Sequence, residues 1–149
     1  MAWSGSPKDV LGRRVTFRIY MHIVRAKSDD VGKEIALRSF FLAKKETLQD
    51  WSSIMNSLEL IYDVENNWEA TDTIEIAWAI LYTYTNNYWL FPLHVFLHKY
   101  GHMTNDGFVL SESSVARFRE LILATIKYFF LKGVVYNTCL LYTSPSPRD

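Results

Sequence analysis

The sequence is poor in cysteine and carries no net charge. Cys139 is the only cysteine among the 149 residues, and 16 basic residues balance 16 acidic ones. One thiol cannot form an internal disulfide framework, which excludes the class of small disulfide-stapled domains. Zero net charge excludes a global attraction to nucleic acid or to membranes, although a local basic patch remains compatible with it. The lack of further cysteines fits a reducing compartment, and we expect the chain to be cytoplasmic.

The sequence also lacks every common catalytic motif. There is no glycine-rich phosphate loop, no G-x-S-x-G stretch and no cysteine–histidine nucleophile pair. Glutamates are scattered along the chain, and no two are placed for a two-carboxylate mechanism. We therefore predict no catalytic residue in this chain, and composition leaves open whether the chain acts as part of an enzyme.

Charged residues are missing from one long segment. Residues 76–98 contain no Asp, Glu, Lys or Arg, which is long enough to span a bilayer. Asn86 and Asn87 fall in its middle, where burying two amides in lipid is costly. Two buried helices joined by an Asn-Asn turn fit this segment better. A small membrane protein is the less favoured alternative.

Apolar residues are abundant and recur at helical spacing. They make up 49% of the chain, and aromatic residues make up 15%. The 3.6-residue periodicity predicts an all-α fold, an irregular multihelical bundle of about six helices. The predicted helices cover residues 8–27, 33–45, 48–68, 71–84, 88–100 and 111–132. Residues 1–7 read as a loose leader, and residues 102–110 as a loop that turns at Asn105-Asp106-Gly107.

Three residues mark helix ends in this scheme. Asp50 is suited to capping the helix that follows it. Pro92 is tolerated in a helix only within the first turn, which fixes where the helix around it begins. Gly101 is a typical residue at a helix end.

Two histidines have the spacing of metal ligands. His94 and His98 lie four residues apart, which places both imidazoles on one helix face. The zinc-protease pattern needs a glutamate after the first histidine, and Val95 stands there instead. No carboxylate is near in sequence to complete a site. We therefore predict no metal site and interpret both histidines as polar positions on a half-buried helix.

His22 and Arg25 are candidates for contact with an anionic ligand. They lie close together in the first predicted helix, and a guanidinium offers a fork that suits phosphate. An ion pair between Arg25 and an acidic residue elsewhere is the alternative, and residue type alone favours it.

Four stretches occur in an order that resembles a known family. They are YMHIVRA (20–26), LRSFF (37–41), YWLFPLHVFLHKY (88–100) and RFRELILATIKYFFLKGVVYNT (117–138). Together they resemble the helical C-terminal part of the N-terminal domain of GmrSD-type modification-dependent restriction enzymes. The resemblance covers residues 15–137.

This resemblance implies an NTP-dependent protein of phage defence that recognises and cleaves modified or foreign DNA. In the family, an upstream α/β half carries an Asp-Gly-Gln-Gln-Arg motif, and many members have a downstream HNH-type nuclease half. Neither is present in this sequence. NTP and divalent metal are implied for the parent protein, and no cofactor is expected in this chain. The expected partners are those two missing halves, with DNA reached through the parent and no membrane contact.

The function implied for this chain is structural or ligand-positioning, without catalysis. A stand-alone helical protein-interaction module is the alternative. Three residues at matched motif positions are candidates for a ligand or interdomain contact: His22, Arg25 and Arg38. The remaining matched positions are interpreted as packing: Tyr20, Met21, Leu37, Phe91 and Pro92.

The last eleven residues, CLLYTSPSPRD (139–149), resemble a translated sequencing-library adapter. We therefore expect residues 8–138 to be a fragment of a larger domain and residues 139–149 to be non-native. A natural disordered tail is the alternative. A domain cut in this way should expose apolar surface where its missing part packed. We expect that surface around Tyr128, Phe129 and Phe130, and on the first helix.

Overall fold

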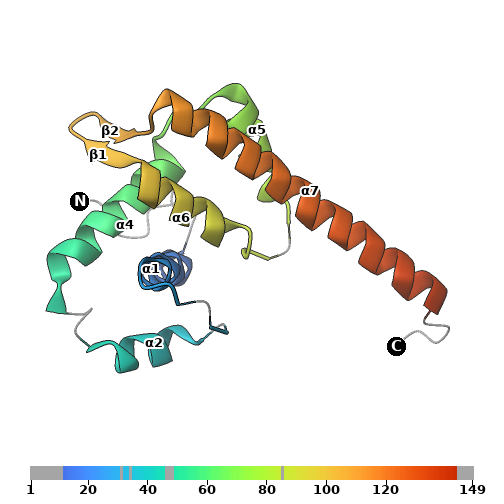
Figure 1. Cartoon of the computed structure of the whole chain (residues 1–149), viewed down its shortest axis with the longest axis horizontal. Helices are drawn as coiled ribbons and strands as arrows, with labels where there is room; N and C mark the ends of the chain where they lie inside the picture. Colours follow the sequence, from blue (N-terminus) through green and yellow to red (C-terminus); the bar gives the residue numbers. More distant parts are fainter. Residues whose placement is uncertain (1–11, 31, 34, 46–48, 85, 144–149) are drawn as a thin grey trace.

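The computed structural model describes residues 12–30, 32–33, 35–45, 49–84 and 86–143, with backbone alone for 133–143. The predicted leader and the end of the adapter-like tail lie outside the described residues. The described part contains six helices and one two-stranded hairpin (Figure 1). The predicted all-α, multihelical fold is confirmed.

The first two helices form one side of the molecule. Helix α1 spans Arg13–Lys27 and buries its apolar face, including Ile19 and Ile23. Helix α2 spans Leu37–Ala43, shorter than the predicted 33–45, and buries only Phe40. Figure 1 shows α1 end-on above α2, and the two helices are in contact.

Helix α4 spans Trp51–Asn66, so it begins three residues later and ends two residues earlier than the predicted 48–68. The Asp50 carboxylate accepts a hydrogen bond from the Ser53 amide at 3.3 Å, so the predicted cap is confirmed. Ile54, Leu58 and Ile61 are buried on its inner face. Trp51 follows the same periodicity but is 59% exposed. The helix begins there, one turn before it reaches the core.

The uncharged segment folds into two helices, as predicted. Helix α5 spans Asp72–Leu81 and helix α6 spans Leu90–Tyr100. Between them the Asn86 side chain accepts a hydrogen bond from the Tyr88 amide at 3.1 Å, which stabilises the turn. Pro92 lies in the first turn of α6. In the described part of the chain, no helix has the length and apolarity needed to cross a membrane.

Residues 102–110 form a hairpin where only a loop is predicted from the sequence. Strand β1, His102–Thr104, pairs antiparallel with strand β2, Gly107–Val109, and Met103 stands opposite Phe108. Three-residue strands are too short for alternation to be visible in the sequence. The hairpin is anchored to α4, because the Phe108 amide donates a hydrogen bond to the Asp63 carboxylate at 2.7 Å.

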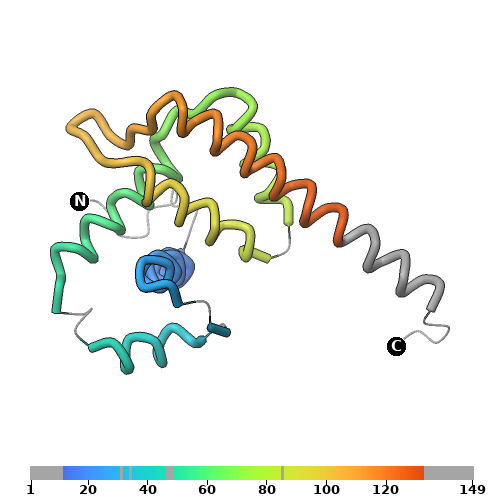
Figure 2. The backbone as a smooth tube through the Cα atoms, in the orientation of Figure 1, coloured from blue at the N-terminus to red at the C-terminus, as the bar shows by residue number. Residues whose placement is uncertain are grey.

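Helix α7 spans Glu112–Thr143 and is longer than predicted. Gly133 does not end it, and it continues into the adapter-like segment. Phe118, Ile122 and Thr125 are buried on the predicted face. The helix packs on α5 and α6, along the backbone path seen in Figure 2, and its C-terminal part extends beyond the body of the molecule (Figure 1).

The core surrounds helix α6, which contacts α1, α4 and α7. The largest fully buried side chains of the core include Trp89, Phe118 and Ile61. The expected exposed surface is present on α7, where Tyr128 and Phe130 are 57% and 38% exposed and Phe129 is half-buried. The expectation of a similar surface on α1 is wrong, because the apolar face of α1 packs against α4 and α6.

Candidate functional site: a groove between helices α1 and α6

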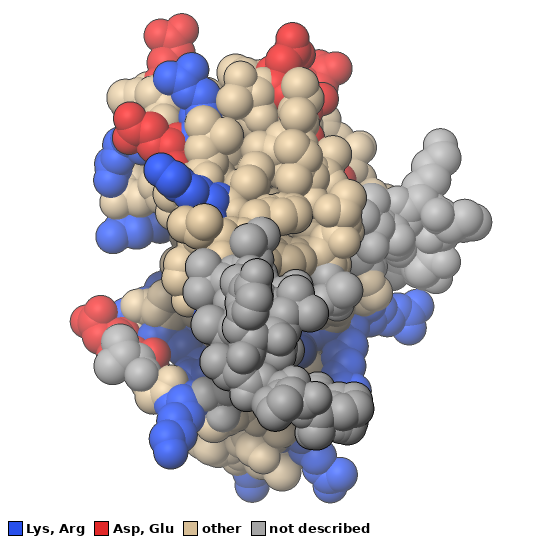
Figure 3. Space-filling model, turned by 90° about the vertical axis from the view of Figure 1, so that its right-hand side faces the viewer, with Lys and Arg blue, Asp and Glu red and all other residues tan. Residues whose placement is uncertain are grey.

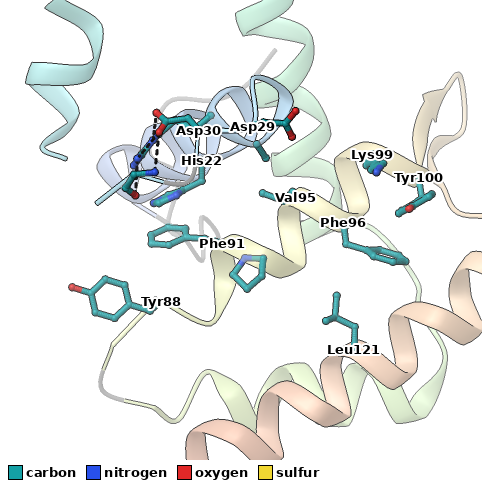
Figure 4. A pocket seen from close by; sticks show the side chains of 14 residues that line it. His22, Asp29, Asp30, Tyr88, Phe91, Val95, Phe96, Lys99, Tyr100 and Leu121 are labelled. Atoms are coloured by element: carbon teal, nitrogen blue, oxygen red, sulfur yellow. Dashed lines mark hydrogen bonds and ion pairs between the residues drawn. The ribbon is translucent and has the colours of Figure 1, made fainter. Parts of the chain in front are cut away.

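A cavity of about 740 Å³ lies between α1, the loop that follows it, and α6, with Leu121 of α7 at its edge (Figure 4). We call it the α1–α6 groove. It brings together four of the residues singled out in the sequence, from two separate motif stretches: His22, Arg25, Phe91 and Pro92. Its other polar lining residues are Asp29, Asp30, Tyr88, Lys99 and Tyr100.

One wall of the groove is a stack of rings and a cation. The His22 imidazole stacks on Phe91, with ring centres 4.2 Å apart and planes 22° from parallel. Arg18 does not itself line the cavity, but its guanidinium carbon lies 5.2 Å from the centre of the same Phe91 ring. Tyr88, which is 55% exposed, stands edge-on to Phe91 at 6.3 Å. This wall offers a flat aromatic surface beside a positive charge.

Arg25 is committed to an internal contact. Its Nε donates to one Asp30 oxygen at 2.9 Å, and its Nη2 donates to the Gly32 and Lys33 carbonyls at 3.0 and 2.9 Å. The hydrogen bonds from Arg25 and from the Gly32 amide lower the pKa of Asp30 to about 2. The ion pair weighed as the alternative for Arg25 is therefore present, and it fixes the loop after α1.

Cations also flank the opposite end of the groove. The Arg117 guanidinium carbon lies 4.8 Å from the ring centre of Tyr100 and 5.8 Å from that of Phe96. The Lys99 ammonium lies 5.3 Å from the Tyr100 ring. A hydrogen bond from Arg117, followed by the charge of Lys99, lowers the pKa of the Tyr100 hydroxyl. This end of the groove is therefore electropositive.

The other matched residues lie away from the groove. Arg38 is exposed on α2. Tyr20 and Met21 are buried on α1, and Leu37 is half-buried. Of the three ligand candidates, the structure thus places His22 and Arg25 at one groove and Arg38 elsewhere.

His94 and His98 each have a protein partner from helix α4. The His94 imidazole is fully buried and pairs through Nε2 with the Glu65 carboxylate. His98 Nε2 lies 3.1 Å from the Ser57 hydroxyl. Burial, and then the charge of Lys27, lower the pKa of His98 to about 4. Within the described residues, no group of three or more His, Cys, Asp or Glu side chains is placed to hold a metal ion.

Glu65, which was not singled out in the sequence, is the centre of a buried polar cluster. Its carboxylate, 2% exposed, accepts a hydrogen bond from the Tyr82 hydroxyl as well as pairing with His94. Burial and the nearby Glu65 charge raise the pKa of Tyr82. A signal was present in the sequence, because Glu65 continues the buried stripe of Ile54, Leu58 and Ile61 at helical spacing.

Charge is segregated along the described chain. Residues 12–45 carry nine Lys and Arg against two Asp among the described positions, whereas residues 49–84 carry seven Asp and Glu and no Lys or Arg. Basic side chains gather over the part of the surface formed by α1 and α2 (Figure 3). Although the net charge of the chain is zero, the surface next to the groove is therefore basic.

Comparison with family models, with curated proteins and with solved structures found no match to this chain.

Proposed function

We propose that this chain is a helical, ligand-positioning segment of an NTP-dependent DNA restriction protein of the cytoplasm, with no catalysis of its own. The observation that carries the proposal is the convergence of two motif stretches of the family resemblance on one groove. His22 from the first stretch stacks on Phe91 from the third, and Pro92 lines the same cavity. His22 and Phe91, 69 positions apart in sequence, thereby contribute to one binding surface.

The character of the groove suits a nucleotide or a DNA segment. A cavity of about 740 Å³ falls in the size range of small-molecule sites. Aromatic rings with cations at both ends offer stacking for a base and charge for phosphate. The basic side formed by α1 and α2 lies beside the groove and adds attraction for a polyanion.

Two experiments test this proposal. The first is to sequence the source locus across both ends of the reading frame. An in-frame Asp-Gly-Gln-Gln-Arg motif upstream would support membership of the restriction family, and a locus without one would count against it.

The second experiment titrates the chain with ATP, with GTP and with a fluorescent DNA duplex, at two salt concentrations. Arg18→Ala should weaken binding and reduce its salt dependence, because it removes one cation beside Phe91. Arg119→Ala is the matched control: it is an exposed position on α7, and among the described residues its guanidinium has no contact with a ring of the groove. Equal effects of the two variants would mean that the groove is not the binding surface.

A helical protein-interaction module is the second candidate. The apolar surface on α7 favours it, with Leu123, Tyr128 and Leu131 between 45% and 59% exposed. Under this alternative, nucleotide and DNA would not bind the groove, and substitutions at Tyr128 and Leu131 would affect association with a protein partner.

A further inference from the structure

A second cavity, of about 570 Å³, lies between the end of α4 and one face of α5. We call it the α4–α5 pocket. Its aromatic lining consists of Trp68, Trp78 and Tyr82, and its acidic lining consists of Glu65, Glu69 and Glu75. It shares no lining residue with the α1–α6 groove. We propose that the α4–α5 pocket binds an organic cation, that is, an ammonium or guanidinium group carried on an apolar stem.

The aromatic walls are the first ground for this assignment. Trp78 stands edge-on to Trp89 at 6.0 Å and to the His94 ring at 5.8 Å, so buried neighbours hold its ring in place. Trp68 is held in the same way by Phe108, edge-on at 5.2 Å. Indole faces attract cations through the ring quadrupole, and tryptophan does so best among the aromatic residues. The pocket therefore has preorganised walls of the kind that bind ammonium groups.

The electrostatics of the pocket are the second ground. Its lining contains no Lys or Arg, and the described residues show no ion pair for Glu69 or Glu75. The C-terminal end of α4 forms one side of the pocket and has no basic residue in its last turn. The helix dipole places partial negative charge at such an end, where lysine or arginine is normally favourable. The negative charges of two carboxylates and of a helix end thus add up in the pocket, and no lysine or arginine lines the pocket to neutralise them.

The two exposed carboxylates are distinct from the buried one. Glu65 already interacts with His94 and Tyr82, and it forms the inner wall. Glu69 and Glu75 are exposed and remain available for a ligand. Glu75 also lies in the first turn of α5, where a carboxylate is favourable in its own right. Replacing Glu75 therefore also changes the charge at the start of α5. A test must distinguish a change in ligand binding at the pocket from this general effect of removing a charge.

The test uses the complete chain and three probes: butyltrimethylammonium, the amide of N-acetyl-lysine, and potassium chloride at equal ionic strength. Tryptophan fluorescence and titration calorimetry follow binding, because Trp68 and Trp78 lie in the wall. We expect saturable binding of both organic cations and none of potassium. Tighter binding of the lysine amide would indicate a peptide side chain as the natural source, and tighter binding of the quaternary ion would indicate a small molecule.

Three variants make the result decisive. Glu69→Gln with Glu75→Gln should weaken organic-cation binding about tenfold, since it removes both exposed charges. Glu59→Gln, an exposed carboxylate on α4 outside the pocket, is the matched control and should have little effect. Trp78→Leu should also weaken binding. Equal loss in the control, or no saturable binding up to about 10 mM of either cation, would overturn the proposal.

Discussion

Gly101 and Phe108 are in contact in a way that leaves no room for a side chain on the glycine. A Cβ atom at position 101 would lie 2.2 Å from Cζ of Phe108 and 2.9 Å from the Leu97 carbonyl oxygen. The φ angle of Gly101 is −100°, which any residue can adopt. The glycine is therefore required for the close approach of the hairpin to the end of α6, and its conformational freedom is not used.

Gly101→Ala is expected to destabilise the protein by about 1–3 kcal/mol, because the Phe108 ring, 6% exposed, must move out of a packed site. Chemical denaturation measures the change in free energy of unfolding. Gly12→Ser is the control: no atom lies within 4 Å of a Cβ there, and the residue precedes α1 at the cap position. Unchanged stability of Gly101→Ala would show that the hairpin can shift without cost.

Glu65→Gln is expected to lower the free energy of unfolding by about 3 kcal/mol. The substitution removes the carboxylate that pairs with buried His94 and weakens the acceptor for Tyr82, and breaking a buried pair on one side is strongly destabilising. Urea denaturation at pH 7 measures it. Glu59→Gln, exposed on the same helix, should change stability by less than about 0.5 kcal/mol. Similar values for the two variants would contradict a structural role for the cluster.

His98 should make stability depend on pH between about 6.5 and 4. Its pKa is about 4 in the folded chain, below its ordinary value, because burial disfavours the charged imidazole. The unfolded chain therefore takes up a proton first as the pH falls, and stability is lost over this window. The loss should reach about 1–2 kcal/mol after allowance for partial solvent exposure.

Thermal denaturation from pH 7 to pH 4 checks this expectation. His98→Gln keeps a polar partner for Ser57 but does not titrate, so its stability should change less over the same range. Lys27 and His94 lie near enough to influence His98, and both remain in the variant. If the stability of the parent protein and that of the variant depend equally on pH, the effect comes from titratable groups other than His98.

The apolar surface of α7 should bind a hydrophobic dye. Tyr128→Gln with Leu131→Gln is expected to reduce dye fluorescence several-fold with little loss of stability, because both side chains are more than half exposed. Lys127→Gln, on the same exposed side, is the control. A parent chain that gives no dye signal would count against a missing partner at this surface.

The helices could be predicted from the sequence because their apolar residues recur at helical spacing and their ends carry recognisable residues. Asp50 caps α4 and Pro92 lies in the first turn of α6, as predicted, although these helices begin at Trp51 and Leu90 and not at the predicted residues 48 and 88. Helix α2 is shorter than predicted, and Ile35, an apolar residue within the predicted range, precedes the helix and is 37% exposed. Helix α7 was predicted to end at residue 132, but it continues through Gly133, since one glycine costs only about 1 kcal/mol within a long helix.

The site was less predictable, because its contacts join distant parts of the chain. His22 and Phe91 were each singled out from their motif stretches, but their stacking depends on how α1 packs against α6. The same holds for His94, whose partner Glu65 lies 29 residues away in sequence. Local sequence patterns identify such residues individually, but tertiary packing determines which of them are in contact.

The segregation of charge along the chain has a consequence for how the protein behaves in an electric field. Because basic residues are concentrated in 12–45 and acidic residues in 49–84 of a neutral molecule, we expect the protein to have a substantial dipole moment. It should be retained at low salt by both cation- and anion-exchange matrices near pH 7, each binding a different side. On approach to a polyanion, it should turn to present helices α1 and α2 first.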